Sequence, residues 1–180
     1  SSTRVSMTMA ELSQQGRIVN GMLEGEIPAL FVTGVEESSR SVTDALVVRD
    51  GELNNVLLST ATGVSAEITP FNGLYPMDID GDSVTEVPRT VMETIDDSDP
   101  SARTYRYTDW VRYDADGTGT TVLTTYHDVE DGWYLQFPET WRDTVQADRS
   151  IGTDEVTVTF SYQKEGADSE EFLKITAITG

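Results

Sequence analysis

The chain of 180 residues contains no cysteine and only one histidine. Without cysteine, disulfides, thiolate nucleophiles, zinc ribbons and iron–sulfur clusters are all excluded. A Ser–His–Asp triad would have to use His127, and the sequence has no Gly-x-Ser-x-Gly elbow to accompany it. His127 lies at the end of an expected strand, and we expect it to be a hydrogen-bonded surface or turn residue. One imidazole and no thiolate also make a zinc site unfavourable.

Long apolar runs are also missing. No stretch approaches the ~20 apolar residues that a membrane-spanning helix needs, so we expect no membrane insertion of this part of the protein. The opening "SSTRVSMTM" has no charged segment followed by an apolar one, and it is typical of a mature or excised form.

Basic residues are few, with 12 lysines and arginines against 32 acids and a net charge of −20. Such a surface repels phosphate backbones and anionic lipids, so no nucleic-acid partner is expected. Divalent cations are the natural small partners of this field, although most of the acids need only keep the protein soluble. Apolar residues at 37% and a length of 180 residues predict a globular chain with a core of useful size.

The sequence is dominated by short apolar or β-branched runs with a period of two. The dipeptides Asp50-Gly51, Asp116-Gly117 and Asp131-Gly132 indicate tight turns between antiparallel strands. We therefore predict a mainly-β fold, with short helices at 9–15 and 138–145. The predicted strands are 17–23, 28–35, 44–50, 53–59, 104–114, 120–127, 132–137, 154–163 and 171–179.

A faint internal repeat is visible. "GEIPALFV" (25–32) lies sixty positions before "TEVPRTV" (85–91), and "DALVVRDGE" (44–52) lies sixty-six positions before "WVRYDADGT" (110–118). Each copy has the length of four antiparallel strands, which is the size of one propeller blade.

The repeat predicts antiparallel four-stranded blade-like units followed by a C-terminal β-extension that begins after residue 128. Residues 1–90 would hold the first repeat and the start of the second. Residues 91–180 would hold the rest of the second repeat and the extension.

The stretch "MDIDGDSVTEVPR" (77–89) carries the sharpest chemical pattern of the chain. A hard cation such as Ca²⁺ takes six to eight oxygens at ~2.3–2.6 Å, and a loop supplies them by turning alternate side chains inward. Positions 1, 3, 5 and 9 of this loop are carboxylates, and position 7 can offer a backbone carbonyl. The predicted calcium ligands are Asp78, Asp80, Asp82, the carbonyl of Val84, and Glu86.

The loop is not an EF-hand, because position 12 is Arg89 after Pro88 and neither flank has helical periodicity. Two alternatives stay open at this point, namely an Asp-rich turn that binds no ion and a site for another hard cation. The stretch "YDADGTGT" (113–120) has threonine and valine at the later ligand positions, so we predict a hairpin turn there.

The pattern Asp-x-Asp-Gly-Asp-x-x-x-Glu between two strands resembles the calcium loop of FG-GAP or VCBS-type repeats, found in integrin-α-like propellers and bacterial surface proteins. In that family the loop joins the first two strands of a blade. Position 6 is usually glycine there but Ser83 here, where a left-handed backbone would cost ~1 kcal/mol. Position 9 is usually aspartate but Glu86 here. Both departures are compatible with calcium and weigh against tight affinity.

Three stretches extend the resemblance to the C-terminal part of poorly characterised Gram-positive lipoproteins: "DIDGDSVTEVP", "TYHDVEDGWYLQFPETW" and "EEFLKITAITG". The resemblance implies a secreted or lipid-anchored, extracytoplasmic protein whose anchoring cysteine lies upstream. It implies a non-enzymatic surface or adhesion module with structural calcium and an unknown protein or glycan ligand.

A different class of function is a carbohydrate-binding or carbohydrate-processing domain. Aromatic rings bind sugars, and paired carboxylates can hydrolyse glycosides, although strand aromatics more often fill a core. Alternation predicts that Trp133 and Tyr134 face opposite sides, so that one of them is exposed. The aromatic residues concentrated in the second half are Trp110, Tyr113, Tyr126, Trp133, Tyr134 and Trp141.

Overall fold

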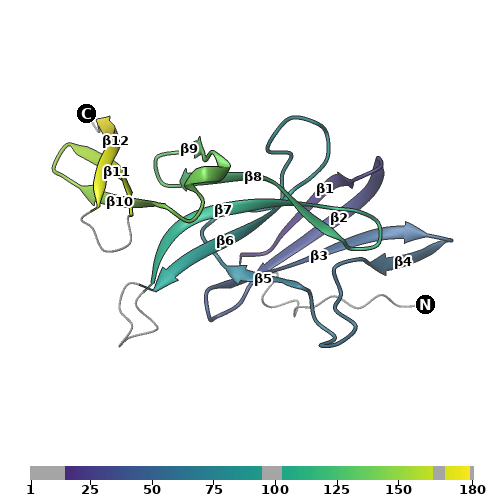
Figure 1. The fold of residues 1–180 in the computed structure, drawn as a ribbon. Coiled ribbons are helices and arrows are strands. Elements are labelled where there is room, and N and C mark those ends of the chain that lie inside the picture. Colours follow the sequence, from purple (N-terminus) through teal and green to yellow (C-terminus); the bar gives the residue numbers. More distant parts are fainter. Residues whose placement is uncertain (1–14, 95–102, 164–168, 179–180) are drawn as a thin grey trace. The chain divides into compact units, whose positions relative to one another are not determined.

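The computed structural model describes residues 15–94, 103–163 and 169–178, and these form a mainly-β, antiparallel structure as predicted (Figure 1). The elements, in chain order, are β1 (Arg17–Leu23), β2 (Ile27–Val35), β3 (Arg40–Arg49), β4 (Glu52–Asn55), β5 (Glu67–Pro70), β6 (Val87–Thr94), β7 (Arg103–Tyr113), β8 (Gly119–Asp128), β9 (Trp133–Gln136), the 3-10 helix η1 (Glu139–Trp141), β10 (Val145–Ile151), β11 (Glu155–Tyr162) and β12 (Glu170–Ile178).

The first sheet has the strand order β1-β2-β3-β4, with β5 paired to β3. Asp50 and Gly51 join β3 to β4 with φ values of 55° and 76°, the left-handed backbone that two-residue hairpin turns require. This confirms the predicted turn. Strand β5 was not predicted, because its four residues end in Pro70 and are too few for alternation to show.

The second sheet has the order β6-β7-β8-β9. Asp114 closes the β7–β8 turn, where its Oδ1 accepts hydrogen bonds from the N–H groups of Asp116 (2.8 Å) and Thr118 (2.9 Å). The stretch 113–120 is therefore the predicted hairpin turn. Strand β6 begins at Val87, sixty residues after the first residue of β2.

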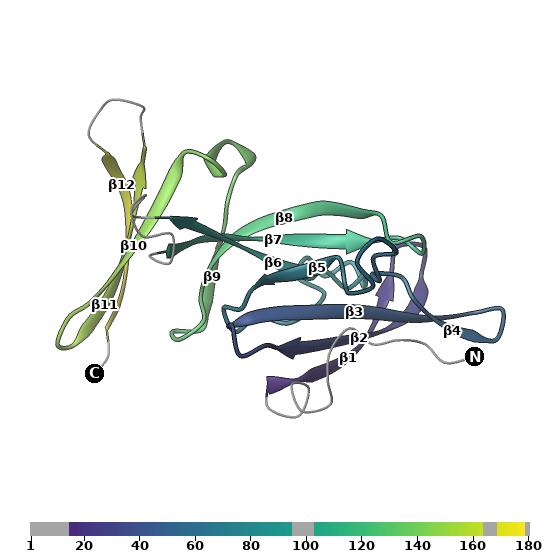
Figure 2. The same ribbon diagram turned by 90° about the horizontal axis from the view of Figure 1, so that it is seen from below.

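The third sheet is a meander of β10, β11 and β12 (Figure 2). The predicted helix at 138–145 is wrong: η1 makes one 3-10 turn, and β10 begins at Val145. Strand β10 pairs with β11 along its whole length, from Val145↔Tyr162 to Ile151↔Val156. Its backbone groups therefore form hydrogen bonds between strands and not within a helix. The other predicted helix, 9–15, lies outside the described residues except for Gln15.

The chain divides by spatial contacts into two units, residues 1–91 with 108–123 and residues 92–107 with 124–180. The predicted division at residue 90, drawn from the repeat, stays a prediction. In the first unit, alternate residues of β2 and β3 face strands β6 and β7 and are removed from water. Full burial of one large apolar side chain stabilises a protein by ~1.5–3 kcal/mol. That core comprises Leu23, Ala29, Phe31, Ala45, Val47, Leu57, Val87, Val111 and Tyr113.

The second unit has an aromatic core. The Phe160 ring is fully buried and meets Tyr126 and Phe137 edge to face, with ring centroids 5.2 Å and 6.0 Å apart. Edge-to-face contacts bring the positive ring edge to the negative ring face and add to the burial of apolar area. Most of the aromatic residues of the second half are thus used for packing.

Candidate metal centre

The acidic stretch forms a closed loop directly before β6. Met77 and Glu86 form an isolated antiparallel bridge, in which the Met77 N–H donates to the Glu86 carbonyl (3.1 Å) and the Glu86 N–H donates to the Met77 carbonyl (2.9 Å). The exit of the loop is held to β1, since the Thr85 N–H donates to the Met22 carbonyl (2.9 Å) and the Met22 N–H donates to Thr85 Oγ1 (3.3 Å). Both ends of the loop are therefore fixed by backbone hydrogen bonds.

Asp78 organises the backbone of the loop. Its Oδ1 accepts hydrogen bonds from the N–H groups of Gly81 (2.7 Å) and Asp82 (3.1 Å), and its Oδ2 accepts one from Ser83 (2.9 Å). Short acidic side chains that accept hydrogen bonds from their own turn stabilise it locally. Asp78 thus holds the loop in a curve around its carboxylate.

The backbone of the loop is left-handed at two positions, with φ values of 81° at Gly81 and 75° at Ser83. The left-handed backbone expected at Ser83 is confirmed, and it carries the ~1 kcal/mol cost of that conformation for a residue with a side chain. Asp80 Oδ1 accepts the Asp82 N–H (3.2 Å), and Asp82 Oδ1 accepts the Val84 N–H (2.9 Å). Each aspartate thus supports the turn that follows it.

Glu86 is fully buried, although it is a carboxylic acid. Its Oε2 accepts the Ile79 N–H (3.2 Å), and its Oε1 lies 3.4 Å from Arg112 Nε. Burial disfavours the charged form and raises the pKa of Glu86 above its ordinary value of 4.5, despite these two partners. A buried carboxylate of this kind needs a positive neighbour to remain ionised at neutral pH.

Part of that positive charge comes from Arg112 on β7, which the sequence analysis did not identify. Its Nη2 lies 3.4 Å from Asp80 Oδ2 and pairs closely with Asp82 Oδ2. Burial lowers the pKa of the Arg112 guanidinium, but the carboxylates of Asp82, Glu86 and Asp80 outweigh it and the net shift is upward. No sequence signal links Arg112 to the loop, because it is 26 residues from Glu86 and is brought there only by sheet pairing.

The structure brings three of the five predicted ligands together. Asp78, Asp80 and Glu86 each offer a carboxylate oxygen, and the three oxygens lie within 4.8 Å of one another. Two oxygens bound to one Ca²⁺ at ~2.3–2.6 Å can be at most ~4.6–5.2 Å apart, so this spacing allows a single ion to touch all three. Within the described part of the chain, no other three acidic or histidine side chains converge in this way.

The other two predicted ligands are placed differently. Asp82 lies outside the group of three, and its second oxygen pairs with Arg112. Val84 is half-buried, and its N–H is held by Asp82. Arg112 thus pairs most closely with Asp82, and it also lies near Asp80 and Glu86 of the group of three.

Of the candidate aromatic residues, Trp110 and Tyr113 are buried in the first unit, and the others lie in the second unit with His127. His127 stacks on Tyr134, with ring centroids 5.0 Å apart, and burial lowers the pKa of its imidazole to about 4. As predicted for the neighbouring pair on β9, Tyr134 is exposed (51%) whereas Trp133 is half-buried against Tyr126. Tyr134 is thus the aromatic ring of the predicted set that is most open to a ligand.

Comparison with protein-family models, with curated proteins and with solved structures finds no match for this chain. The likeness to a calcium-binding repeat therefore depends on the residues quoted above and on the geometry of residues 78–86. No helix in the described ranges is long and apolar enough to cross a lipid bilayer.

Proposed function

We propose that residues 78–86 bind one Ca²⁺ ion, and that the ion stabilises the chain where it enters β6. The observation that carries the proposal is the convergence of oxygens from Asp78, Asp80 and Glu86 to within 4.8 Å. Calcium prefers oxygen ligands and tolerates flexible geometry, so carbonyl groups and water can complete its shell.

Charge counting supports the same conclusion. The loop carries four carboxylates, and Arg112 supplies one positive charge, which leaves −4 + 1 = −3 in one small region. Like charges this close raise one another's free energy unless a cation or a proton intervenes. A Ca²⁺ ion would reduce the excess to −1 and would share the acids with Arg112, which already holds Asp82.

The proposed role of the ion is structural. The two ends of the loop are hydrogen-bonded to each other, the exit is also bonded to β1, and Glu86 leads directly into β6, whose first residue, Val87, is part of the core. In the described ranges, these acids accept hydrogen bonds from backbone N–H groups and pair with Arg112, and none of these groups is a nucleophile. We therefore propose a non-enzymatic module.

The module is proposed to consist of blade-like repeats of the FG-GAP or VCBS type, on a secreted or lipid-anchored protein. In support, β2 and β6 begin sixty residues apart, at Ile27-Pro28 and Val87-Pro88, and each pairs with the strand that follows it in the chain. Strand β2 is the second strand of a five-stranded sheet, whereas β6 is the edge strand of a four-stranded one. The acidic loop precedes β6 as the short turn at Glu24–Glu26 precedes β2. An adhesion-type role with a protein or glycan ligand follows from this resemblance.

The decisive experiment compares unfolding in calcium and in chelator for the wild type and for Asp80→Asn. Asparagine keeps an oxygen for the Asp82 N–H but removes the charge, so the loop can still form. At a calcium concentration a hundredfold above the dissociation constant, the ion stabilises the wild type by ~2.7 kcal/mol, and the variant should lose most of this gain.

Asp116→Asn is the matched control, because Asp116 is an exposed aspartate (84%) in the β7–β8 turn, away from the three converging oxygens. It should respond to calcium as the wild type does. Identical unfolding of the wild type in calcium and in chelator would refute the proposal. An equal response to Mg²⁺ would reassign the loop to hard cations in general.

A carbohydrate-binding function is the second candidate, and the exposure of Tyr134 favours it. Its ring lies against His127 on one side, so that only the other face could stack on a sugar. A glycan array tests this candidate: binding that Tyr134→Ala abolishes would support it, and an array without binding would leave the calcium module.

A further inference from the structure

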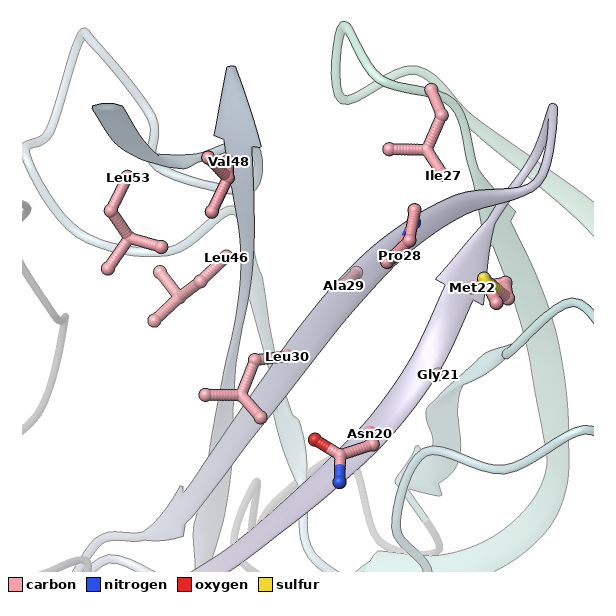
Figure 3. Close-up of a pocket in the computed structure, with 10 residues that line it drawn as sticks. All are labelled: Asn20, Gly21, Met22, Ile27, Pro28, Ala29, Leu30, Leu46, Val48 and Leu53. Carbon is pink, nitrogen blue, oxygen red and sulfur yellow. The ribbon is translucent and has the colours of Figure 1, made fainter. Parts of the chain in front are cut away.

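The first sheet carries an apolar groove of about 560 Å³ on the part formed by β1, β2, β3 and β4 (Figure 3). Cross-strand partners Met22 and Pro28 line one side, and the partners Val48 and Leu53 line the other. The lining is apolar except for Asn20. Neither the calcium loop nor the exposed tyrosine belongs to it.

The groove arises where two neighbouring strands separate. Pairing of β2 with β3 ends at Ala29↔Val47, one residue short of Pro28. Proline has no N–H to donate, so a ladder cannot continue through it on that side. Figure 3 shows β2 and β3 diverging beyond this point, with Leu30 and Leu46 where the strands are still close.

The groove is open to water. Val48 is 71% exposed, Leu53 46% and Met22 38%, whereas Val47, next to Val48 on β3, is buried in the core. Single exposed apolar residues are ordinary, but apolar side chains gathered from four neighbouring strands form the kind of exposed patch that is typical of an interaction site. The cross-strand pairs Met22–Pro28 and Val48–Leu53 form the two sides of this patch.

Two acidic turns bound the groove. Glu24 and Glu26 lie in the β1–β2 turn, and Asp50 and Glu52 lie at the β3–β4 turn, all four exposed. Each turn is within two residues of a lining side chain, and therefore within about one Debye length, ~8 Å at physiological salt. The field at the groove is accordingly negative.

The basic residue of these turns does not offset that field. Arg49 donates from its Nη2 to the Ala115 carbonyl (2.5 Å) and lies 3.7 Å from Asp116 Oδ1. Its guanidinium therefore lies at the β7–β8 turn, which is itself acidic. This negative field favours a ligand that carries positive charge.

We propose that the groove binds an extended cationic peptide segment in which apolar side chains alternate with lysine or arginine. An extended chain turns successive side chains to opposite faces, so its apolar side chains can enter the groove while its charges remain near the two turns. A second copy of this chain is a poor occupant, because two surfaces of charge −20 repel each other.

The test uses three capped octapeptides, (Leu-Lys)₄, (Leu-Glu)₄ and (Ser-Lys)₄, titrated against the protein by calorimetry. Only (Leu-Lys)₄ should bind, and its affinity should fall as salt is raised. Equal binding of (Ser-Lys)₄ would overturn the proposal, because it would show unspecific attraction to an acidic protein. Binding of (Leu-Glu)₄ would overturn the charge assignment.

Variants locate the peptide on the protein. Val48→Ser combined with Leu53→Ser should weaken (Leu-Lys)₄ binding by at least about tenfold, because two apolar contacts are lost. Ile151→Ser is the control, since Ile151 is equally exposed (72%) but lies on β10. These positions are at the surface, and melting curves confirm that each variant folds.

Charge variants complete the test. Glu24→Gln with Glu26→Gln should weaken binding and flatten its salt dependence, whereas Glu37→Gln with Asp143→Asn, both exposed and distant in sequence, should not. Equal losses in the two charge pairs, or in Ile151→Ser and the groove variant, would refute the proposal. A dimer that the groove variant dissolves would refute it in favour of self-association.

Discussion

Removal of Arg112 is the sharpest test of how the acidic loop is neutralised. In the substitution Arg112→Gln, three carboxylates lose their shared partner: Asp80 and Glu86, each 3.4 Å from a guanidinium nitrogen, and Asp82, which pairs more closely. Glutamine retains part of the side-chain volume and one N–H donor group, so the main change is the loss of charge.

The expected magnitude follows from these distances and burials. At ~4 Å and an effective dielectric constant of ~20, each pair attracts by ~4 kcal/mol before desolvation is subtracted. Breaking a fully buried pair typically costs ~3–5 kcal/mol. Arg112 is 21% exposed, and its partners Asp80 and Asp82 are more exposed than it is. We therefore expect Arg112→Gln to lower the free energy of unfolding in chelator by ~2 kcal/mol.

The assay is urea unfolding at neutral pH, in chelator and in saturating calcium. Calcium should restore most of the stability that Arg112→Gln loses, because the ion takes over the neutralisation of the same acids. Its affinity for the variant should also be higher than for the wild type, since a competing cation is gone. Arg40→Gln, which breaks the exposed Arg40–Glu36 pair, should change stability by less than ~1 kcal/mol in either buffer.

Two results would contradict this reasoning. If Arg112→Gln were as stable as the wild type in chelator, the guanidinium would not be neutralising the loop. If its deficit were the same in calcium and in chelator, the acids would not be a shared site for the two cations.

Three further predictions concern residues around the loop. Calcium affinity should fall as the pH is lowered through the raised pKa of Glu86, because only the carboxylate binds the ion, and calcium titrations of Glu86→Gln should show a smaller fall over the same range. In chelator the sign reverses: the contribution of Glu86 to stability is present below its ordinary 4.5 and is lost as the pH rises through the raised pKa, and urea unfolding of Glu86→Gln should lack this contribution. Gly21→Ala should destabilise the protein by ~1–3 kcal/mol in urea unfolding, because the new Cβ would lie 2.8 Å from the Thr85 Cβ. Tyr113→Phe should cost ~1–2 kcal/mol by the same measurement, because the buried Glu67 carboxylate loses the tyrosine hydroxyl that donates to its Oε1.

Much of the sheet structure could be predicted because alternation is a local signal. The run at 17–23 coincides with β1, and the runs at 120–127 and 132–137 match β8 and β9 within one residue at each end. Turn dipeptides such as Asp50-Gly51 marked the hairpins because their backbone conformation depends on the residues themselves.

The wrong predictions concern segments whose structure is determined by tertiary contacts. The stretch 138–145 begins with proline and acidic and polar residues in the manner of a helix, yet β11 offers a free edge and Val145 joins it instead. In the loop, spacing predicted that all four acids converge; three of them do, and spacing did not predict which acid a guanidinium would take instead. That choice depends on Arg112, which reaches Asp82 from another strand of the fold.

The hydrogen bonds between Met22 and Thr85 give the two proposed sites a common boundary. Met22 lines the groove, and Thr85 immediately precedes the buried glutamate of the acidic loop. If bound calcium raises the affinity for the peptide through this boundary, bound peptide raises the affinity for calcium by the same factor, because linkage between two ligands is reciprocal. A peptide that binds tenfold more tightly in calcium would raise the affinity for calcium tenfold. The amount of bound peptide would then depend on the calcium concentration.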